Sequence, residues 1–381
     1  MNQLPKKLQK KLEDRKSNNA LRSLGDNSNL VDFSSNDYLG FSTSKIIFER
    51  ALAILKEHNL EKNGATGSRL LSGNHSLYTL TESAIANFHN TEAALIFTSG
   101  YDANLGFFSS IPQRGDFIFY DDLCHASIRD GIQLSPAKSY KFKHDDLNDL
   151  VTMIERMPLH DGEVYVVTES VFSMDGDTPD LKAMAHFCTL KEFHLVVDEA
   201  HAIGVFGETG VGRIQELGLE QAVFARIVTF GKALGCHGAA VLGGKSLKEY
   251  LVNFARSFIY TTGLPPHSIA TLSAAYACLS EDKVNFQRLH RNIEILRLCI
   301  DHFQLEEHFI ASESAVHCCI IPGNDRVKAV SEKLKEKGFD VKAILSPTVP
   351  IGQERLRLCV HSFNTEEEIK NCMELIATFV K

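Results

Sequence analysis

Short apolar segments rich in Val, Ile and Phe alternate with helical segments through much of the chain. The apolar segments are residues 93–97, 117–120, 164–168, 194–197, 226–229 and 239–242. This alternation is typical of βαβ units around a mostly parallel sheet. Because the segments are continuously apolar, we expect helices to cover both faces of the sheet. The sequence therefore predicts an α/β fold.

The pattern changes after Pro265-Pro266, where two prolines interrupt the chain. A helical stretch at 268–300 comes next, followed by short strands near 315–321 and 355–360 that are interspersed with helices. These features are typical of a smaller α+β domain. We predict three parts, which are an N-terminal segment at 1–44, a large α/β domain at 45–265 and a C-terminal α+β domain at 266–381.

The charge balance excludes some classes of partner. The 381 residues carry 40 Lys and Arg against 48 Asp and Glu, a formal net charge of -8 at pH 7. A chain with this charge is not attracted to phosphate backbones or anionic membranes in general. No run of about 18 apolar residues, the length that spans a bilayer, occurs either. We therefore expect neither nucleic acid nor a membrane as a partner.

The basic residues 1–22 leave more than one interpretation open. A transit peptide or a surface-binding helix would both be rich in Lys and Arg. The apolar stripe formed by Leu4, Leu8 and Leu12 is narrow, however, and Glu13 and Asp14 interrupt the basic run. We interpret this stretch as a docking helix with a solvated basic face.

The cysteines indicate the compartment. Nine are scattered through the chain, and no Cys-x-x-Cys pair occurs among them. An odd, unpatterned set in a chain of this length indicates a reducing compartment and argues against a structural zinc site. We expect a cytoplasmic protein with no bound metal.

Polar residues follow several of the predicted strands, at the sheet edge where open parallel sheets bind ligands. Ser99, Gly100 and Tyr101 come after 93–97 and open a helical pattern. The free N–H groups and positive dipole end of such a helix suit an anion such as phosphate. His125 follows 117–120, and Asp198 follows 194–197.

The run Asp198-Glu199-Ala200-His201 also matches the acidic box of a helicase. That ATPase site requires an upstream Gly-x-x-x-x-Gly-Lys-Ser/Thr loop that holds phosphates and Mg²⁺. The closest segment, Gly244-Lys245-Ser246, has Ala239 where the first glycine belongs, and it lies downstream of the box. Together with the negative net charge, this argues against a helicase.

Lys232 indicates a different kind of site from the ATPase site of a helicase. It follows 226–229 through Phe230-Gly231, and a strand-end lysine facing an apolar interior can act as a nucleophilic amine. A pyridoxal 5′-phosphate (PLP) site needs a lysine for the aldehyde, a carboxylate for the pyridinium, a flat group against the ring and an anion site for the phosphate. The sequence can supply these groups, in the same order, from Lys232, Asp198, His125 and residues 99–101. We predict PLP as the cofactor.

Several motifs carry a resemblance to a known family. They are Phe33-Ser34-Ser35-Asn36-Asp37-Tyr38-Leu39-Gly40, Val171-Phe172-Ser173-Met174-Asp175-Gly176-Asp177, the run 198–201, Val228-Thr229-Phe230-Gly231-Lys232 and Arg355-Leu356-Arg357-Leu358. In this order they resemble the α-oxoamine synthases, a family of fold type I PLP enzymes, from about residue 10 to the C-terminus. The resemblance implies a homodimeric, PLP-dependent acyltransferase that condenses an amino acid with an acyl thioester and releases CO₂.

The resemblance also implies a role for each matching residue around the cofactor. Lys232 would hold the cofactor covalently and act as general base, Asp198 would pair with the pyridine nitrogen, and His125 would stack on the ring. His201 and Ser173 would bond near the phenolic oxygen of the ring. The residues matching the phosphate segment and its surroundings are Ser99, Gly100, Tyr101, Thr229 and, given by the partner subunit, Thr262.

Substrate contacts are implied in the same way. Asn36 and Arg355 match positions that hold the amino-acid carboxylate, and Arg15 matches one that meets the acyl substrate. The segment 346–352 before Arg355 is closer to alanine-using than to glycine-using relatives. It favours L-alanine and a pimeloyl thioester, carried by CoA or acyl carrier protein, as in biotin synthesis.

Other activities remain open from the sequence. A glycine C-acetyltransferase and a long-chain acyl relative belong to the same family, and a fold type I aminotransferase shares the cofactor. Ala233 and Asp102, where many relatives have Gly and Ala, leave the acyl chain undecided. A non-catalytic partner subunit is a further alternative, against which the joint presence of Lys232, Asp198 and His125 speaks.

Overall fold

The computed structural model describes residues 4–22, 24–25, 29–157, 161–281 and 283–381. The contacts between Cα atoms divide the chain into two compact units. The smaller unit consists of the described residues of 1–35, 174–176 and 289–381, and the larger unit of those of 36–173 and 177–288. The three-part division at residues 44 and 265 stays a prediction about domains, because these units group residues by contacts alone.

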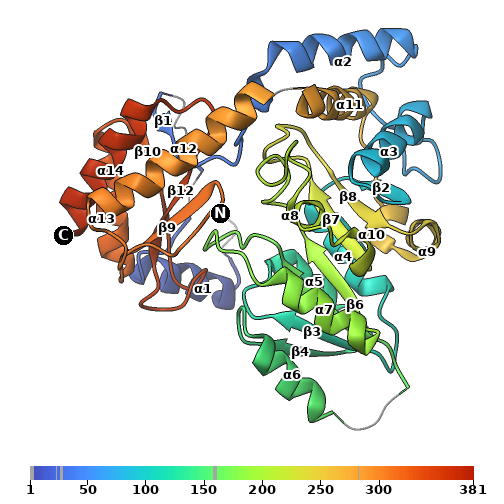
Figure 1. Cartoon of the computed structure of the whole chain (residues 1–381), viewed down its shortest axis with the longest axis horizontal. Coiled ribbons are helices and arrows are strands. Elements are labelled where there is room, and N and C mark those ends of the chain that lie inside the picture. Colours follow the sequence, from blue (N-terminus) through green and yellow to red (C-terminus); the bar gives the residue numbers. More distant parts are fainter. Residues whose placement is uncertain (1–3, 23, 26–28, 158–160, 282) are drawn as a thin grey trace. The chain divides into compact units, whose positions relative to one another are not determined.

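The larger unit is built on a seven-stranded sheet with the strand order β2-β8-β7-β6-β5-β3-β4 (Figure 1). Its strands are β2 (Ala93–Phe97), β3 (Phe117–Asp121), β4 (Lys138–Phe142), β5 (Val164–Glu169), β6 (His194–Asp198), β7 (Ala225–Thr229) and β8 (Ala239–Gly243). The pairs from β7 to β4 are all parallel, and only β8 runs antiparallel to its neighbours β2 and β7. The predicted mostly parallel sheet is confirmed.

Helices cover both faces of this sheet, as its continuously apolar strands require. Successive residues of β5 belong to different hydrophobic clusters, Tyr165 and Val167 to one and Val164 and Val166 to the other. The first cluster includes side chains of α4 (Gly100–Ser110), α5 (Ala126–Gln133) and α9 (Lys245–Phe254). The second includes side chains of α6 (Leu147–Glu155) and α7 (Leu181–Lys191). Strand β5 therefore buries both its faces.

Strand β4 is the element of this sheet that the sequence did not predict. It lies at the sheet edge beside β3, and four of its five residues, 138–141, are exposed. Its sequence, Lys-Ser-Tyr-Lys-Phe, is correspondingly polar. Because four of its five residues are exposed, β4 lacks the apolar signal of the strands that are buried on both faces.

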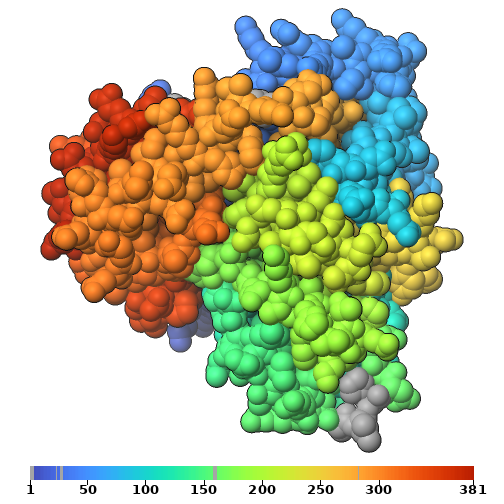
Figure 2. All heavy atoms as spheres, in the orientation of Figure 1, coloured from blue at the N-terminus to red at the C-terminus, as the bar shows by residue number. Residues whose placement is uncertain are grey.

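The larger unit contains further helices besides those named above. They are η1 (Phe41–Thr43), α2 (Lys45–Glu57), α3 (Ser76–Phe88), α8 (Arg213–Glu216), η2 (Glu220–Ala222), α10 (Arg256–Ile259) and α11 (Pro266–Glu281). Helix α11 packs along α2, and the two lie side by side in both views (Figure 1, Figure 2). Helix α12 (Lys283–His302) follows α11 and continues from the larger unit into the smaller one.

The smaller unit contains an antiparallel sheet with the order β11-β12-β9. These strands are β11 (Lys342–Ile344), β12 (Arg355–Cys359) and β9 (Val316–Ile320), and β1 (Val31–Asp32) pairs in parallel with β10 (Phe339–Asp340). Its helices are α1 (Lys6–Ser17), α13 (Asn324–Glu336) and α14 (Glu366–Val380). Within the described part of the chain, no helix has both the length and the apolar character needed to cross a membrane.

Candidate active site

A cavity of about 260 Å³ lies in the larger unit. Its walls come from the carboxyl ends of the parallel strands: β5 ends at Glu169, β6 at Asp198 and β7 at Thr229. This is the sheet edge at which the sequence predicts a ligand site. The predicted residues that line the cavity are Asn36, Ser99, Gly100, Tyr101, His125, Ser173, Asp198, His201, Thr229 and Lys232.

Asp198 is a buried carboxylate with a neighbouring donor for each of its oxygens. Asn104 donates its side-chain N–H to Oδ2 at 2.9 Å, and the backbone N–H of Ala200 donates to Oδ1 at 2.9 Å. Hydrogen bonds of this kind favour the ionised form of a carboxylate. They also fix the direction in which the charge faces the cavity.

Sequence reasoning missed Asn104, which also lines the cavity and donates to Ser127 Oγ at 3.0 Å. It lies on α4, four residues after Gly100, and residues at this spacing share one face of a helix. That spacing from the predicted anion segment is the signal that could have identified it.

His125 is neutral, and its ring orientation is fixed locally. The backbone N–H of Ser127 points at Nδ1 from 3.2 Å, and the Ser127 hydroxyl lies 2.8 Å from the same atom. Nδ1 is therefore the acceptor nitrogen of the ring. Burial lowers the pKa of His125, and the positive charge of Lys232 lowers it further, while Asp198 opposes the change. An uncharged flat ring is thus presented to the cavity.

Glu169 is a second buried carboxyl group on the cavity wall, and the sequence analysis did not select it. It is the ladder partner of Asp198 on the neighbouring strand, and Oε1 accepts the backbone N–H of His125 at 2.5 Å. Burial first, and then the charge of Asp198, raise the pKa of Glu169 to about 8. Glu169 therefore carries a proton at neutral pH.

The N-terminus of α4 forms the anion-binding part of the wall. Ser99 caps the helix by accepting the backbone N–H of Asp102 at 3.0 Å. The N–H groups of the first turn that follows have no partner within the helix. A Cβ atom on Gly100 would lie 2.6 Å from Thr229 Cγ2, so only glycine lets this helix end approach the end of β7.

His201 and Lys232 occupy fixed positions on the wall. The hydroxyl of the buried Tyr38 lies 2.7 Å from His201 Nδ1 and holds its ring. After Lys232 the chain turns back, because Gly235 N–H donates to the Lys232 carbonyl at 2.8 Å. Gly235 has φ +58°, and a Cβ there would lie 2.2 Å from Ser42 N, so glycine is required.

Three predicted residues do not line this cavity. Thr262 is an exposed residue of the larger unit. Arg355 is buried in the smaller unit, where it forms an ion pair with Asp175 and donates to the carbonyl of Met174 at 3.1 Å. Arg15, also in the smaller unit, donates to the Ala20 carbonyl at 3.3 Å and lines a separate cavity of about 500 Å³.

Comparison with known proteins identifies the family. The sequence model of the family "Aminotransferase class I and II" matches residues 28–376. The 8-amino-7-oxononanoate synthase of Emericella nidulans is 41% identical over 93% of this chain and 90% of its own. The putative 8-amino-7-oxononanoate synthase of Halalkalibacterium halodurans is 42% identical over 92% of this chain and 87% of its own. The chain belongs to the 8-amino-7-oxononanoate synthases, within the class I and II aminotransferase family.

Solved structures agree with this family. The 8-amino-7-oxononanoate synthase from Francisella tularensis superimposes with a TM-score of 0.78 at 31% identity, over 93% of this chain and 98% of its own. Sphingomonas wittichii serine palmitoyltransferase gives a TM-score of 0.90 at 26% identity, over 99% and 98%. A structure described as SPT with PLP internal aldimine gives 0.86 at 27% identity, over 92% and 87%. The predicted fold type I architecture and α-oxoamine synthase family are confirmed.

Replacing Glu169 by Gln tests its buried proton. Wild type takes up this proton on folding between pH 4.5, the ordinary pKa, and about 8, so its free energy of unfolding falls as pH rises through that window. The limiting slope for one proton is about 1.4 kcal/mol per pH unit. We expect Glu169→Gln to flatten this dependence in urea unfolding of the apoprotein. The exposed control Glu49→Gln should keep the wild-type slope, and equal slopes for all three proteins would contradict the assignment.

Proposed function

We propose that the protein condenses L-alanine with a pimeloyl thioester, with loss of CO₂, to give 8-amino-7-oxononanoate and the free carrier. This is a PLP-dependent acyltransferase reaction of biotin biosynthesis. The observation that carries the proposal is one cavity that combines a strand-end lysine, a hydrogen-bonded buried aspartate, a neutral imidazole and a helix N-terminus. Membership of the 8-amino-7-oxononanoate synthases supports the same reaction.

The cavity residues fit PLP. Asn104 Oδ1 is buried on the cavity wall, and no described residue forms a hydrogen bond with it. Gly100 is the first residue of α4 and has no side chain, so none of its own atoms would cover the helix N-terminus that phosphate binding requires. When bound, PLP supplies an electron sink that stabilises negative charge on the amino-acid Cα.

Three residues would have different roles toward the cofactor and the substrate: Asp198, His125 and Lys232. Asp198 would pair with the ring nitrogen of the cofactor and favour the protonated form of that nitrogen. The uncharged ring of His125 offers a flat face without competing for that proton. The Lys232 amine, once displaced by substrate, would take the proton from Cα and later return it. Ser173 and His201 would hydrogen-bond the cofactor ring.

Substrate binding is proposed for three residues. Asn36 lines the cavity and would bind the amino-acid carboxylate. The family resemblance assigns the same role to Arg355, whose guanidinium would supply a charge-assisted bond. Arg15 would meet the acyl substrate, supported by its place on the wall of the second cavity. The carrier would be CoA or acyl carrier protein.

A homodimer and a cytoplasmic location complete the proposal. Thr262 is exposed and lies off the cavity of its own unit, as expected of a residue that serves a partner's phosphate. Large apolar side chains on α2, Ile46 and Phe48, are 60% and 64% exposed and could be covered by a second copy. A reducing compartment is supported by the nine free cysteines.

Lys232→Ala tests the cofactor assignment directly. Borohydride reduction of the wild-type protein with PLP should fix the cofactor on Lys232, and peptide mapping should recover the labelled peptide. The variant should take no label and should lose its activity, because the only amine proposed to bind the aldehyde is gone. A label on a different lysine would contradict the site.

Substrate identity is tested by pairing amino acids with thioesters and weighing the products. L-alanine with a pimeloyl thioester should give the best kcat/KM. Glycine differs by one methyl group, which is worth roughly 1–3 kcal/mol, so it should be slower by about 10- to 200-fold. If glycine with acetyl-CoA reacts faster than alanine with either pimeloyl-CoA or pimeloyl-acyl carrier protein, the substrate assignment is wrong and the cofactor site is unaffected.

Mixing two inactive variants tests the shared site. Lys232→Ala and Thr262→Ala should each be strongly impaired. Random subunit exchange makes about half the dimers mixed, each with one intact site, so activity should recover to about a quarter of wild type. An active Thr262→Ala protein, or proven exchange without recovery, would contradict the assignment of Thr262 to the partner's site.

A further inference from the structure

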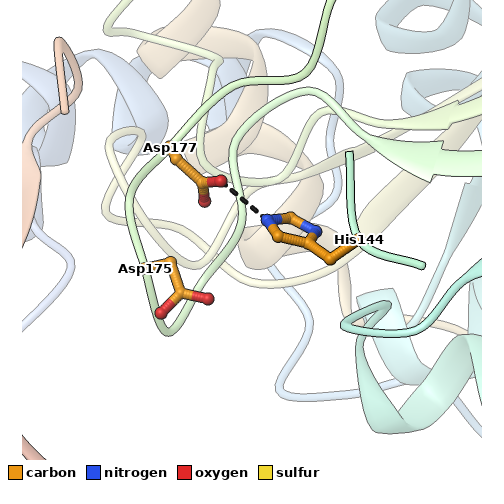
Figure 3. A group of neighbouring side chains, drawn as sticks. All are labelled: His144, Asp175 and Asp177. Atoms are coloured by element: carbon orange, nitrogen blue, oxygen red, sulfur yellow. Dashed lines mark hydrogen bonds and ion pairs between the residues drawn. The ribbon is translucent and has the colours of Figure 1, made fainter. Parts of the chain in front are cut away.

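His144 joins the carboxyl ends of neighbouring strands in the larger unit. It follows β4, and its Nδ1 lies 3.0 and 3.1 Å from the two oxygens of Asp121, the last residue of β3. Its Nε2 lies 2.7 Å from an oxygen of Asp177, in the segment after β5 (Figure 3). One side chain therefore connects two carboxylates that come from different strand ends.

These contacts require a positively charged ring. An ionised carboxylate only accepts hydrogen bonds, whereas a neutral imidazole has one N–H and one acceptor nitrogen. Both nitrogens of His144 face carboxylate oxygens, so both must carry protons. Burial lowers the pKa of His144, but the hydrogen bonds and charges of Asp121 and Asp177 outweigh it and raise this pKa to about 10.

The Asp121 side of this contact leads to His125. Asp121 is fully buried, and its carboxylate also accepts the backbone N–H of Leu123 at 2.8 Å and of Asp145 at 3.0 Å. The Asp121 carbonyl accepts the N–H of Cys124 at 3.1 Å. Asp121 thus shapes the turn that ends at His125, and His144 supplies the charge that a buried carboxylate needs.

The Asp177 side leads to Ser173. Phe172 donates its backbone N–H to the Asp177 carbonyl at 3.0 Å, which closes the segment that carries Ser173. The His144 ring packs edge-on against the Phe172 ring, with 4.4 Å between centroids. Asp177 and Phe172 therefore both hold this segment against His144.

We infer that His144 is a positioning residue. As a cation, it holds in place both the turn before His125 and the segment that carries Ser173 on the cavity wall. The role of these two residues toward the cofactor rests on the proposed function. The anchoring of their segments does not, because it follows from contacts within the chain. His144 itself does not line the cavity, so it acts through Asp121 and Asp177.

His144→Gln tests the inference, and His194→Gln is a matched control. His194 also pairs with a carboxylate, Glu163 at 2.8 Å. It is the first residue of β6, however, and so lies at the amino end of that strand, away from the carboxyl ends that line the cavity. Hydrogen exchange of the apoprotein at 121–127 and 170–177 should quicken by about tenfold or more in His144→Gln, the loss expected when bonds to charged groups are removed. The same segments should keep their wild-type rates in His194→Gln.

Cofactor affinity gives the second readout. The PLP dissociation constant, measured by absorbance at a temperature where all the proteins are folded, should rise by about tenfold or more in His144→Gln and stay within about twofold in the control. Uniform acceleration of exchange over the whole chain with unchanged affinity would overturn the inference, because that pattern indicates global destabilisation alone. Should His144→Gln not fold, Asp177→Asn must loosen 170–177 selectively, and the absence of that effect overturns it. A wild-type protein that binds no PLP would refute the proposed function while leaving the exchange result to decide the anchoring.

Discussion

The constraint on which the site depends is a carboxyl group buried inside the protein. Asp198 is buried at the end of β6, and a buried polar group without hydrogen-bond partners is costly. Donors from two places face its oxygens, the side chain of Asn104 on α4 and the backbone of Ala200. The position of α4 on the sheet therefore matters twice, for the anion-binding helix end and for the hydrogen bonding of Asp198.

The titratable groups around Asp198 are each held in a defined protonation state. Glu169, the ladder partner of Asp198, takes a proton because burial raises its pKa and the charge of Asp198 raises it further. His125 stays neutral because it is buried beside Lys232. His144, facing two carboxylates, is a cation. Burial lowers the pKa of both histidines, and their different partners decide the outcome.

Much of the fold and the site could be predicted from the sequence. The central strands are apolar on both faces, and the residues that follow them lie together on one cavity wall. Edge strand β4 was missed because it is polar, and Glu169 because the predicted strand stopped one residue short of it. Asn104 gave only a weak signal, since a polar residue inside a helix is usually explained by solvent exposure.

The sequence by itself determined the family and which polar residues follow each predicted strand. It also identified the lysine, the aspartate and the histidine that lie on the cavity wall. These are local properties of short motifs, because a motif can be identified from neighbouring residues without knowledge of the fold. Only the tertiary structure decided which partners these groups have and that the pKa of His125 is lowered by burial. Residues distant in sequence approach one another, such as Asn104 and Asp198, which are 94 positions apart. No local pattern contains such distances, and they exist only once the sheet and its helices have packed.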